Sequence, residues 1–436
     1  MEPLLLGLDL GTSSCKAAVV SHGGRELSHG RIRVPWERVP TGAEIDPERL
    51  VDAAIAAARE ALAGAPDGPI GAIGVASLAE TGILLDARGA AVAPAIAWHD
   101  SRGAAQAERL AAELGAERFS ERTGLAPRPL CSLVKYRWLR DEHAGAARGT
   151  RWLSVAEWIV HRLGGERVSE LSLASRTGWL DVHTRAWWDE ALAWSGAPPG
   201  LLGEPAPAGA PAGFAGDALP SALGAVLAVG GHDHLSAAVG AGATGEGDVL
   251  VSWGTAEAFI RAVAPLDAAR VRAAVADGIN VGWHAVDGRQ CLLGAMRSGA
   301  ALQRVLDLLG VSPEGRAELE RAALAAPAAA GGIELHGLHE DRIALTGIGD
   351  GASPALIWRA ALESTGRAGR DILERMARVA GPQRRIVLAG GWAEGQAARA
   401  VTAAHLGPFE LSGAVYMGAR GAALTAGRAA GLIEAS

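Results

Sequence analysis

The sequence predicts a mixed α/β protein in which two domains of the same design enclose a cleft. Its 436 residues exceed what a single hydrophobic core usually organises, so two domains are expected. Two distant segments, 4–20 and 248–260, also contain the same parts in the same order. Each has an apolar strand, a Gly-Thr turn and a second strand. Because one such segment opens each half of the chain, the repetition favours a duplicated fold.

In the first half, apolar runs separated by turn residues predict strands, and Asp46 followed by Pro47 predicts the N-cap and first residue of a helix. That helix is expected to continue to about residue 65. The Gly/Pro/Ala-rich stretch 196–221 is expected to be a surface connection, because such a composition cannot build a core. The other strands are expected at 4–10, 16–20, 26–34, 70–77, 82–86, 95–98 and 226–231, and the other helices at about 103–115, 132–142, 154–163, 186–195 and up to 240.

The second half restarts at residue 248, and the boundary is expected near 243–247, which gives domains 1–243 and 244–436. Strands that alternate with helices indicate a mixed sheet. After the hairpin at 248–260, helices are expected at about 299–309, 352–380 and 393–405, with a strand at 385–388.

The amino-acid composition indicates which kinds of partner and which cellular compartment to expect. A net charge of −7 and a pI near 6.0 argue against nucleic acid or an anionic membrane, which need clustered positive charge. Three distant cysteines, an odd number, indicate a reducing cytoplasm without a disulfide scaffold or a cysteine metal site. No uncharged apolar run reaches the roughly 18–20 residues that a membrane helix needs, and no basic region precedes the first apolar stretch as in a signal peptide. We therefore expect a cytoplasmic protein.

The two Gly-Thr turns have the composition of phosphate-binding loops. Gly11 and Gly254 allow the backbone to approach a ligand, and successive amides in such a turn can bind an anion. The hydroxyls of Thr12, Ser13 and Thr255 add donors. One such turn is weak support, since Gly-Thr turns occur in ordinary hairpins. A pair of them favours a polyphosphate held from both sides, as in an ATP-dependent phosphotransferase.

The order of several motifs resembles the FGGY family of carbohydrate kinases, which belongs to the actin-like ATPase superfamily of duplicated ribonuclease-H-like domains. The resemblance covers nearly the whole chain, and the motifs together are far more specific than any one of them. The similar segments are DLGTSS at 9–14 and SWGTAEA at 252–258 (phosphate motifs), 82–102 (the sugar side), 174–188 (before the kinase-core strand), GGHDHLSAAVGAG at 230–242 (the catalytic base) and LAGGWAEGQ at 388–396 (adenosine).

Asp233 is the candidate general base, because phosphorylating a hydroxyl requires removing its proton. The residues alone leave a second role equally open, in which Asp233 caps the next helix; the resemblance favours the base. His232 and His234 form an H-x-H pair, but no further His or Cys cluster completes a metal shell. They are therefore expected to hydrogen-bond the base and the sugar, with His234 as the sugar contact. Asp9, beside the first phosphate turn, and Asp233 are the candidate ligands for Mg²⁺.

The sugar site is expected to use Glu80, Asp100 and Arg102, since carboxylates in a small cleft hydrogen-bond neighbouring hydroxyls. At 79–80 glycerol-type members of the family carry Arg-Glu, whereas this chain has Ala79 before Glu80. That departure leaves the sugar unidentified. Glu257 is either a further sugar contact or an exposed surface residue.

For the nucleotide, Gly254 and Thr255 are expected to hold the phosphates. Gly299 and Gln303, four residues apart, share one helix face and match family positions that contact nucleotide. Gly390 and Gly391 end a strand, where adenosine could lie against the backbone. The Asn that the family often has shortly afterwards is absent, so the adenine contacts stay open.

The resemblance thus implies an enzyme that uses ATP and Mg²⁺ to phosphorylate a hydroxyl of a small sugar or polyol. One alternative is an ATP- and sugar-binding regulatory protein of the same fold without activity, which would be expected to lack the base or a phosphate loop. Another is an actin- or chaperone-like ATPase, a class that lacks a sugar-side segment like 82–102. A homodimer is left open as the oligomeric state.

Overall fold

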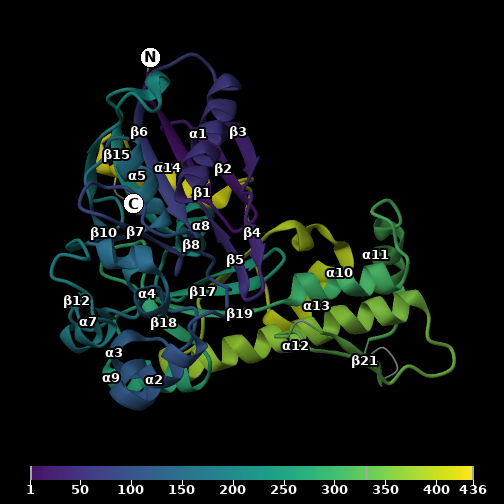
Figure 1. Cartoon of the computed structure of the whole chain (residues 1–436). Coiled ribbons are helices and arrows are strands. Elements are labelled where there is room, and N and C mark those ends of the chain that lie inside the picture. The colour runs from purple at the N-terminus through teal and green to yellow at the C-terminus, as the bar shows by residue number, and fades with distance from the viewer. Residues whose placement is uncertain (1, 329–331, 341, 435–436) are drawn as a thin grey trace.

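The computed structural model describes residues 2–328, 332–340 and 342–434, and its two large sheets lie one in each half of the chain (Figure 1). In spatial order, the first sheet consists of β14 (Pro211–Phe214), β15 (Val226–His232), β6 (Ile70–Ser77), β1 (Leu4–Leu10), β2 (Ser14–Val20) and β3 (Glu26–Arg33). The second consists of β18 (Asn280–Trp283), β19 (Gln290–Met296), β17 (Glu257–Val263), β16 (Asp248–Trp253), β22 (Arg385–Ala389) and β23 (Glu410–Leu411).

The two sheets share one topology. In each, the opening strand, β1 or β16, pairs antiparallel with the strand that follows it in the chain. On its other side it pairs parallel with a strand that arrives after a helix, β6 or β22. The predicted α/β fold with two duplicated domains is confirmed.

Among the described residues, four smaller sheets lie in the first half of the chain and one lies in the second half. They are β4 (Glu37–Val39) with β5 (Gly42–Ile45) and β8 (Ala95–Ile96), β7 (Gly82–Leu85) with β9 (Arg151–Ser154), β10 (Ser169–Glu170) with β13 (Pro205–Ala206), β11 (Leu180–Asp181) with β12 (Ala186–Trp187), and β20 (Glu334–His336) with β21 (Ala344–Thr346).

Some helices, such as α1, begin at a side-chain cap. α1 starts as expected, with Pro47 as its first residue and the Asp46 carboxylate accepting from the Glu48 amide. The helices of the first half are α1 (Pro47–Ala63), α2 (Ala104–Leu114), α3 (Ala116–Thr123), α4 (Ser132–Glu142), α5 (Val155–Arg162), α6 (Leu171–Ala174), α7 (Asp189–Ser195) and α8 (Asp233–Ala241). Those of the second half are α9 (Ala268–Ala276), α10 (Ser298–Leu308), α11 (Arg316–Ala325), α12 (Pro354–Ala380), α13 (Gln396–Leu406) and α14 (Met417–Ala429).

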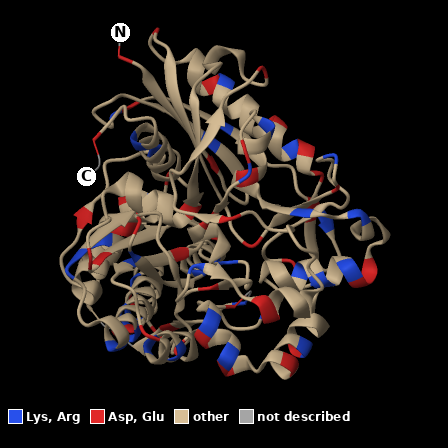
Figure 2. Ribbon diagram, turned by 90° about the vertical axis from the view of Figure 1, so that its left-hand side faces the viewer, with Lys and Arg blue, Asp and Glu red and all other residues tan. Residues whose placement is uncertain are grey.

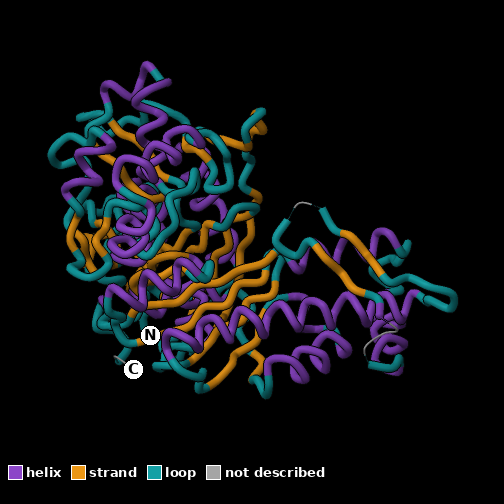
Figure 3. Tube along the Cα trace, turned by 90° about the horizontal axis from the view of Figure 1, so that it is seen from below, coloured by secondary structure: helices purple, strands orange, loops and turns teal. Residues whose placement is uncertain are grey.

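Helices cover both sheets, and two of them lie between the sheets. α1 and α5 pack on one face of the first sheet, and α10, α12 and α13 pack on one face of the second. In both Figure 1 and Figure 3, α10–α13 extend away from the sheets to the right. α8, from the first half, packs on the second sheet, whereas α14, from the second half, packs on the first. The two helices also pack against each other.

Glycines allow the close approach of α14 to the first sheet. A Cβ added at Gly7 would lie 1.8 Å from the Ala419 carbonyl oxygen, and one added at Gly74 would lie 1.9 Å from that of Ala422. α14 was not predicted from the sequence, and it completes the apolar covering of strands that lie more than half the chain away.

The expectation that 196–221 is only a surface connection is wrong in part. β14 lies within it and pairs antiparallel with β15 at the edge of the first sheet. Pro211 is the first residue of this strand, and an edge position tolerates a residue without an amide donor. Burial of the neighbouring Ala212 anchors the strand despite its poor composition.

The side of the molecule that faces the viewer in Figure 2 carries no patch of a single charge in the part of the chain that the structure describes. Basic and acidic residues are intermingled there, and neither sign forms a broad continuous area. No helix among the described residues combines the length and apolar character needed to cross a bilayer. Because charge does not mark a functional site on this side, we locate the candidate site from the positions of the predicted residues.

Candidate active site

The first predicted phosphate loop is the turn between β1 and β2. The Gly11 amide donates to the Ser14 carbonyl at 3.1 Å and closes the turn. Thr12 is half-buried and Ser13 is exposed at its tip. Strand pairing places Asp9 opposite Lys16 at the base of the turn. A carboxylate and an ammonium thus lie directly behind the loop.

Asp9 is buried and incompletely hydrogen-bonded. Its Oδ1 has no hydrogen-bond partner among the described residues. Burial and the charge of Asp233 raise the pKa of Asp9 to about 7, although Lys16 and His232 oppose the shift. Strand pairing places Asp9 opposite Ala76 and Ala76 opposite Gly231, so Asp9 and Asp233 lie at the same end of the first sheet. A buried carboxylate oxygen without a partner at that end suits a divalent cation. The donors present therefore fit the Mg²⁺ that the sequence analysis expects.

Asp233 lies where β15 ends and α8 begins. The His232 Nε2 lies 3.1 Å from its Oδ1, and the His234 amide donates to the same oxygen at 2.7 Å. Burial acts to raise the pKa of Asp233, but the electrostatic interaction with His234 and the hydrogen bond from His232 outweigh it and lower the pKa to about 2. The carboxylate is therefore ionised at neutral pH. His232 occupies the N-cap position, so the alternative that Asp233 caps this helix is wrong.

His232, Asp233 and His234 each present one potential ligand atom within 4.8 Å of the others. However, the hydrogen bond to Asp233 already engages the His232 Nε2. Burial lowers the pKa of His234, which favours the neutral imidazole, a form that can both donate and accept a hydrogen bond. His234 as a sugar contact stays a prediction.

Glu80 forms a buried ion pair with Arg176. The Arg176 Nη2 and Nε lie 2.6 Å and 2.7 Å from the Glu80 Oε1, and each side chain is 9% exposed. Both charges act on the imidazole of His234, the neighbour of Asp233 in the chain. Glu80 itself has a left-handed backbone, with φ of 61°, which costs a residue other than glycine some strain. The structure places this predicted sugar residue at the site but gives it a protein partner.

Asp100 and Arg102 form a different constellation from the one expected. The Asp100 side chain is fully buried and accepts from the Arg102 Nε and Nη2 at 2.9 Å and 2.8 Å and from the Ala43 amide at 3.0 Å. Arg102 also donates to Glu44 at 2.7 Å. Protein donors thus occupy both oxygens of Asp100, which the sequence analysis expected to hydrogen-bond the sugar.

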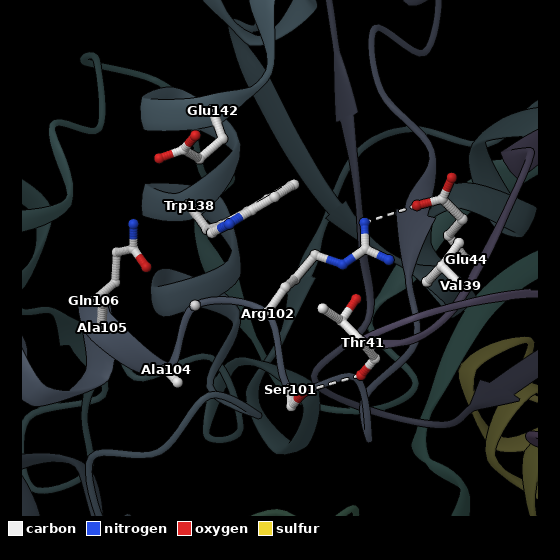
Figure 4. Close-up of a pocket in the computed structure, with 11 residues that line it drawn as sticks. Val39, Thr41, Glu44, Ser101, Arg102, Ala104, Ala105, Gln106, Trp138 and Glu142 are labelled. Carbon is white, nitrogen blue, oxygen red and sulfur yellow. Dashed lines mark hydrogen bonds and ion pairs between the residues drawn. The ribbon is translucent and has the colours of Figure 1, made fainter.

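Arg102 lines a surface hollow of about 520 Å³ (Figure 4). Its guanidinium lies 5.2 Å from the ring centre of Trp138 and spans the hollow toward Glu44. None of the residues that line this hollow is Asp9, Glu80 or Asp233. Arg102 as a sugar contact stays a prediction.

Trp98, by contrast, is connected to the first phosphate loop. Its indole Nε1 donates to the Thr12 hydroxyl at 2.9 Å, and its side chain is 40% exposed. The next residue, His99, has its pKa lowered mainly by burial. The sequence analysis did not select Trp98, although it lies in the quoted segment 82–102.

The second phosphate loop adjoins the other predicted nucleotide residues. A Cβ at Gly299 would lie 1.9 Å from the Gly254 carbonyl oxygen, and one at Gly390 would lie 2.3 Å from that of Trp253. The Ala300 amide donates to the Thr255 carbonyl at 2.8 Å. The structure thus brings Gly254, Thr255, Gly299 and Gly390 together at one end of the second sheet.

Gln303 and Gly391 lie at the outer side of this group. Gln303 is exposed and donates to Asp307 at 2.9 Å, one turn further along α10. Gly391 is exposed, and a Cβ there would contact nothing within 4 Å. The neighbouring Trp392 carries the guanidinium of Arg316 at 4.3 Å from its ring centre. Neither Trp392 nor Arg316 was selected from the sequence.

Glu257 fits neither of its two expected roles. It is 2% exposed, and its carboxyl group accepts from the Ser298 hydroxyl at 2.7 Å. Burial raises its pKa to about 8. Glu257 is therefore an internal, protonated support between the second loop and the start of α10.

Two protein-family models match the sequence of this chain. The N-terminal domain of the FGGY family of carbohydrate kinases matches residues 4–240, and the C-terminal domain matches residues 288–430. The first match alone covers more than half of the chain. The chain belongs to the FGGY family.

Individual relatives agree with this assignment. A xylulose kinase of Streptomyces rubiginosus is 32% identical over 262 residues, which are 58% of this chain and 53% of the relative. A glycerol kinase of Bordetella parapertussis is 30% identical over 401 residues, 85% of this chain and 77% of the relative. The crystal structure of a xylulose kinase from Rhodospirillum rubrum aligns with a TM-score of 0.88 at 27% identity, over 97% of this chain and 89% of that one.

The aligned part spans about half the length of several of the curated relatives, such as the Streptomyces kinase. Family membership explains why the motifs of both halves recur in one order. The family names cover more than one acceptor, so the identity of the acceptor rests on this protein's own residues.

Proposed function

We propose that this FGGY protein is a kinase that transfers the γ-phosphoryl group of ATP to a hydroxyl of a small sugar or polyol. The observation that supports this most directly is Asp233, an ionised carboxylate held by two histidines at the end of β15. Such a group can accept the proton of an acceptor hydroxyl as the bond to phosphorus forms.

The phosphate groups would be held by Thr12 and Thr255 and the amides of the two turns. Asp9 and Asp233 are the residues that would hold Mg²⁺, which when bound would neutralise phosphate charge. Asp9 supports this through its buried oxygen without a partner. The ion pair of Glu80 and Arg176 would form the wall of the acceptor site, together with His234.

We further propose that the protein works in a reducing cytoplasm, since Cys15, Cys131 and Cys291 are free and buried. A homodimer is the oligomeric state proposed. Sedimentation at several concentrations tests it: a single species with the mass of one chain would contradict a dimer.

Coupled ADP release from purified protein tests the proposed function. The acceptor panel should begin with xylulose, glycerol and gluconate, the acceptors in the names of the relatives. We expect at least one neutral sugar, polyol or sugar acid to raise ADP release well above the rate without acceptor. Nucleotide binding without any acceptor-dependent release would instead indicate a regulatory protein without activity.

A further inference from the structure

The hydrogen bond between Trp98 and Thr12 joins the segment 82–102 to the first phosphate loop. Thr12 Oγ1 accepts from the indole Nε1 at 2.9 Å, and the Thr12 carbonyl accepts from the Trp36 indole at 2.6 Å. The loop is therefore held at both its side chain and its backbone. The equivalent hydroxyl of Thr255 has no hydrogen-bond partner among the described residues, so the two loops are not equivalent.

A hydroxyl has one hydrogen to donate and two lone pairs that accept. Because one lone pair of Thr12 accepts from Trp98, the hydrogen must point elsewhere. Within the described part of the chain, the Thr12 hydroxyl donates to no acceptor. Thr12 lies three residues from Asp9, whose carboxylate is buried and lacks a partner at one oxygen. The hydrogen of Thr12 is thus available to a ligand on the side of the loop where phosphate is expected.

The backbone of Trp98 is itself fixed. The Lys135 ammonium is 1% exposed and donates to the carbonyls of Trp98, Pro129 and Leu130 at 3.0–3.1 Å. Three short hydrogen bonds from one buried ammonium define where residue 98 lies. Trp98 is nevertheless 40% exposed, so the anchored backbone holds an indole that solvent can reach.

We propose that Trp98 is a positioning residue that orients the Thr12 hydroxyl as a donor to the γ-phosphoryl group of the bound nucleotide. The inference rests on the proposed kinase function and deepens it. The indole N–H holds the side chain of the phosphate loop, and the hydroxyl hydrogen of Thr12 is left for the nucleotide.

The test is a double-substitution cycle with Trp98→Phe and Thr12→Val. Phenylalanine keeps an apolar ring but has no N–H, and valine keeps the shape of threonine without its hydroxyl. Binding of a non-hydrolysable ATP analogue and of ADP is titrated for each variant, and kcat and KM are measured with the best acceptor. Trp194→Phe is the matched control, because it removes an indole hydrogen bond from α7 to Glu113 of α2, and neither residue belongs to a phosphate loop.

We expect Trp98→Phe to weaken binding of the ATP analogue about three- to tenfold, the effect of losing one neutral hydrogen bond, with ADP binding unchanged. The double variant should bind the analogue no more weakly than Thr12→Val alone, and kcat should fall more than KM for the acceptor rises. Additive losses in the double variant, or equal losses for ADP and the analogue, would overturn the proposal.

A failure of the proposed function gives a different result. In that case no acceptor supports turnover by the wild-type protein, while the binding cycle can still be read. Trp194→Phe should leave both titrations unchanged. An effect of equal size in Trp194→Phe would show that loss of any indole hydrogen bond perturbs binding, and this too would contradict the assignment.

Discussion

Arg176 and Glu80 are 96 positions apart in the chain, yet their side chains meet at 2.6 Å with only 9% of each exposed. Ala79 precedes Glu80, and the guanidinium comes from the end of α6. The charge of Glu80 is therefore balanced inside the protein.

Glu80→Ala should destabilise the protein. It leaves the Arg176 guanidinium buried and unpaired, so we expect the free energy of unfolding to fall by about 3 kcal/mol. Denaturant unfolding measures this. Glu142→Ala, which removes an exposed carboxylate, is the control and should change little. Glu80→Leu combined with Arg176→Met should regain much of the loss; a single variant as stable as the wild type would show that the pair contributes nothing.

Asp233→Asn should abolish acceptor phosphorylation while nucleotide binding stays nearly intact. The amide cannot accept the hydroxyl proton, and loss of a general base typically lowers the rate by about 10²–10⁴. Steady-state kinetics at saturating acceptor and titration with an ATP analogue measure the two effects. Turnover close to that of the wild type would remove Asp233 from the role of base.

Thr255→Val should weaken the handling of ATP more than the binding of acceptor. The substitution removes a donor from the second loop without changing its size. We expect the KM for ATP to rise by about ten- to a hundredfold, the effect of losing a hydrogen bond to a charged group. If only the KM for the acceptor rises, the second loop would belong to the acceptor side of the cleft.

Glu257 should impose a pH dependence on stability. Its folded pKa of about 8 lies above the usual value, so the folded state retains a proton that the unfolded chain releases. Stability from this group is therefore complete below pH 4.5 and decreases as pH rises toward 8. Glu257→Gln, which resembles the protonated acid, should flatten this decline in unfolding measurements from pH 5 to 8. The exposed Glu318→Gln is the control, and equal curves for wild type and Glu257→Gln would contradict the prediction.

Gly74→Ala should be poorly tolerated. Its new Cβ would lie 1.9 Å from a backbone oxygen of α14, which cannot move aside as a flexible side chain could. We expect a loss of about 1–3 kcal/mol in the free energy of unfolding. Gly413→Ala, where a Cβ meets nothing within 4 Å, provides the comparison. A thermal midpoint unchanged by Gly74→Ala would mean that α14 does not pack this closely.

Most of the helices and strands that the sequence predicted correctly depend on short local patterns. The two Gly-Thr hairpins, the cap at Asp46 and the strand before Asp233 each depend on residues within a few positions of one another. β14 was missed because its pairing with β15 outweighs a composition that lacks strand formers. α14 was missed because its small residues gain their value only from contact with the first sheet.

The site was predicted less completely than the fold, for a related reason. A sequence motif indicates that a carboxylate is present but not which partner it will meet. Asp100 was expected to read hydroxyls, but the guanidinium two positions later and the amide of Ala43 occupy it. The importance of Arg176 and Trp98 comes from contacts across 96 and 86 positions, which no local pattern encodes.

α8 packs on the second sheet and α14 on the first, and this arrangement affects how the chain folds during synthesis. β1 leaves the ribosome early, but the helix that covers it is synthesised after nearly all the rest. Until then one apolar face of the first sheet has no covering helix, so the first half cannot reach its final state during synthesis. The first sheet therefore stays incomplete in a growing chain until α14 has been synthesised.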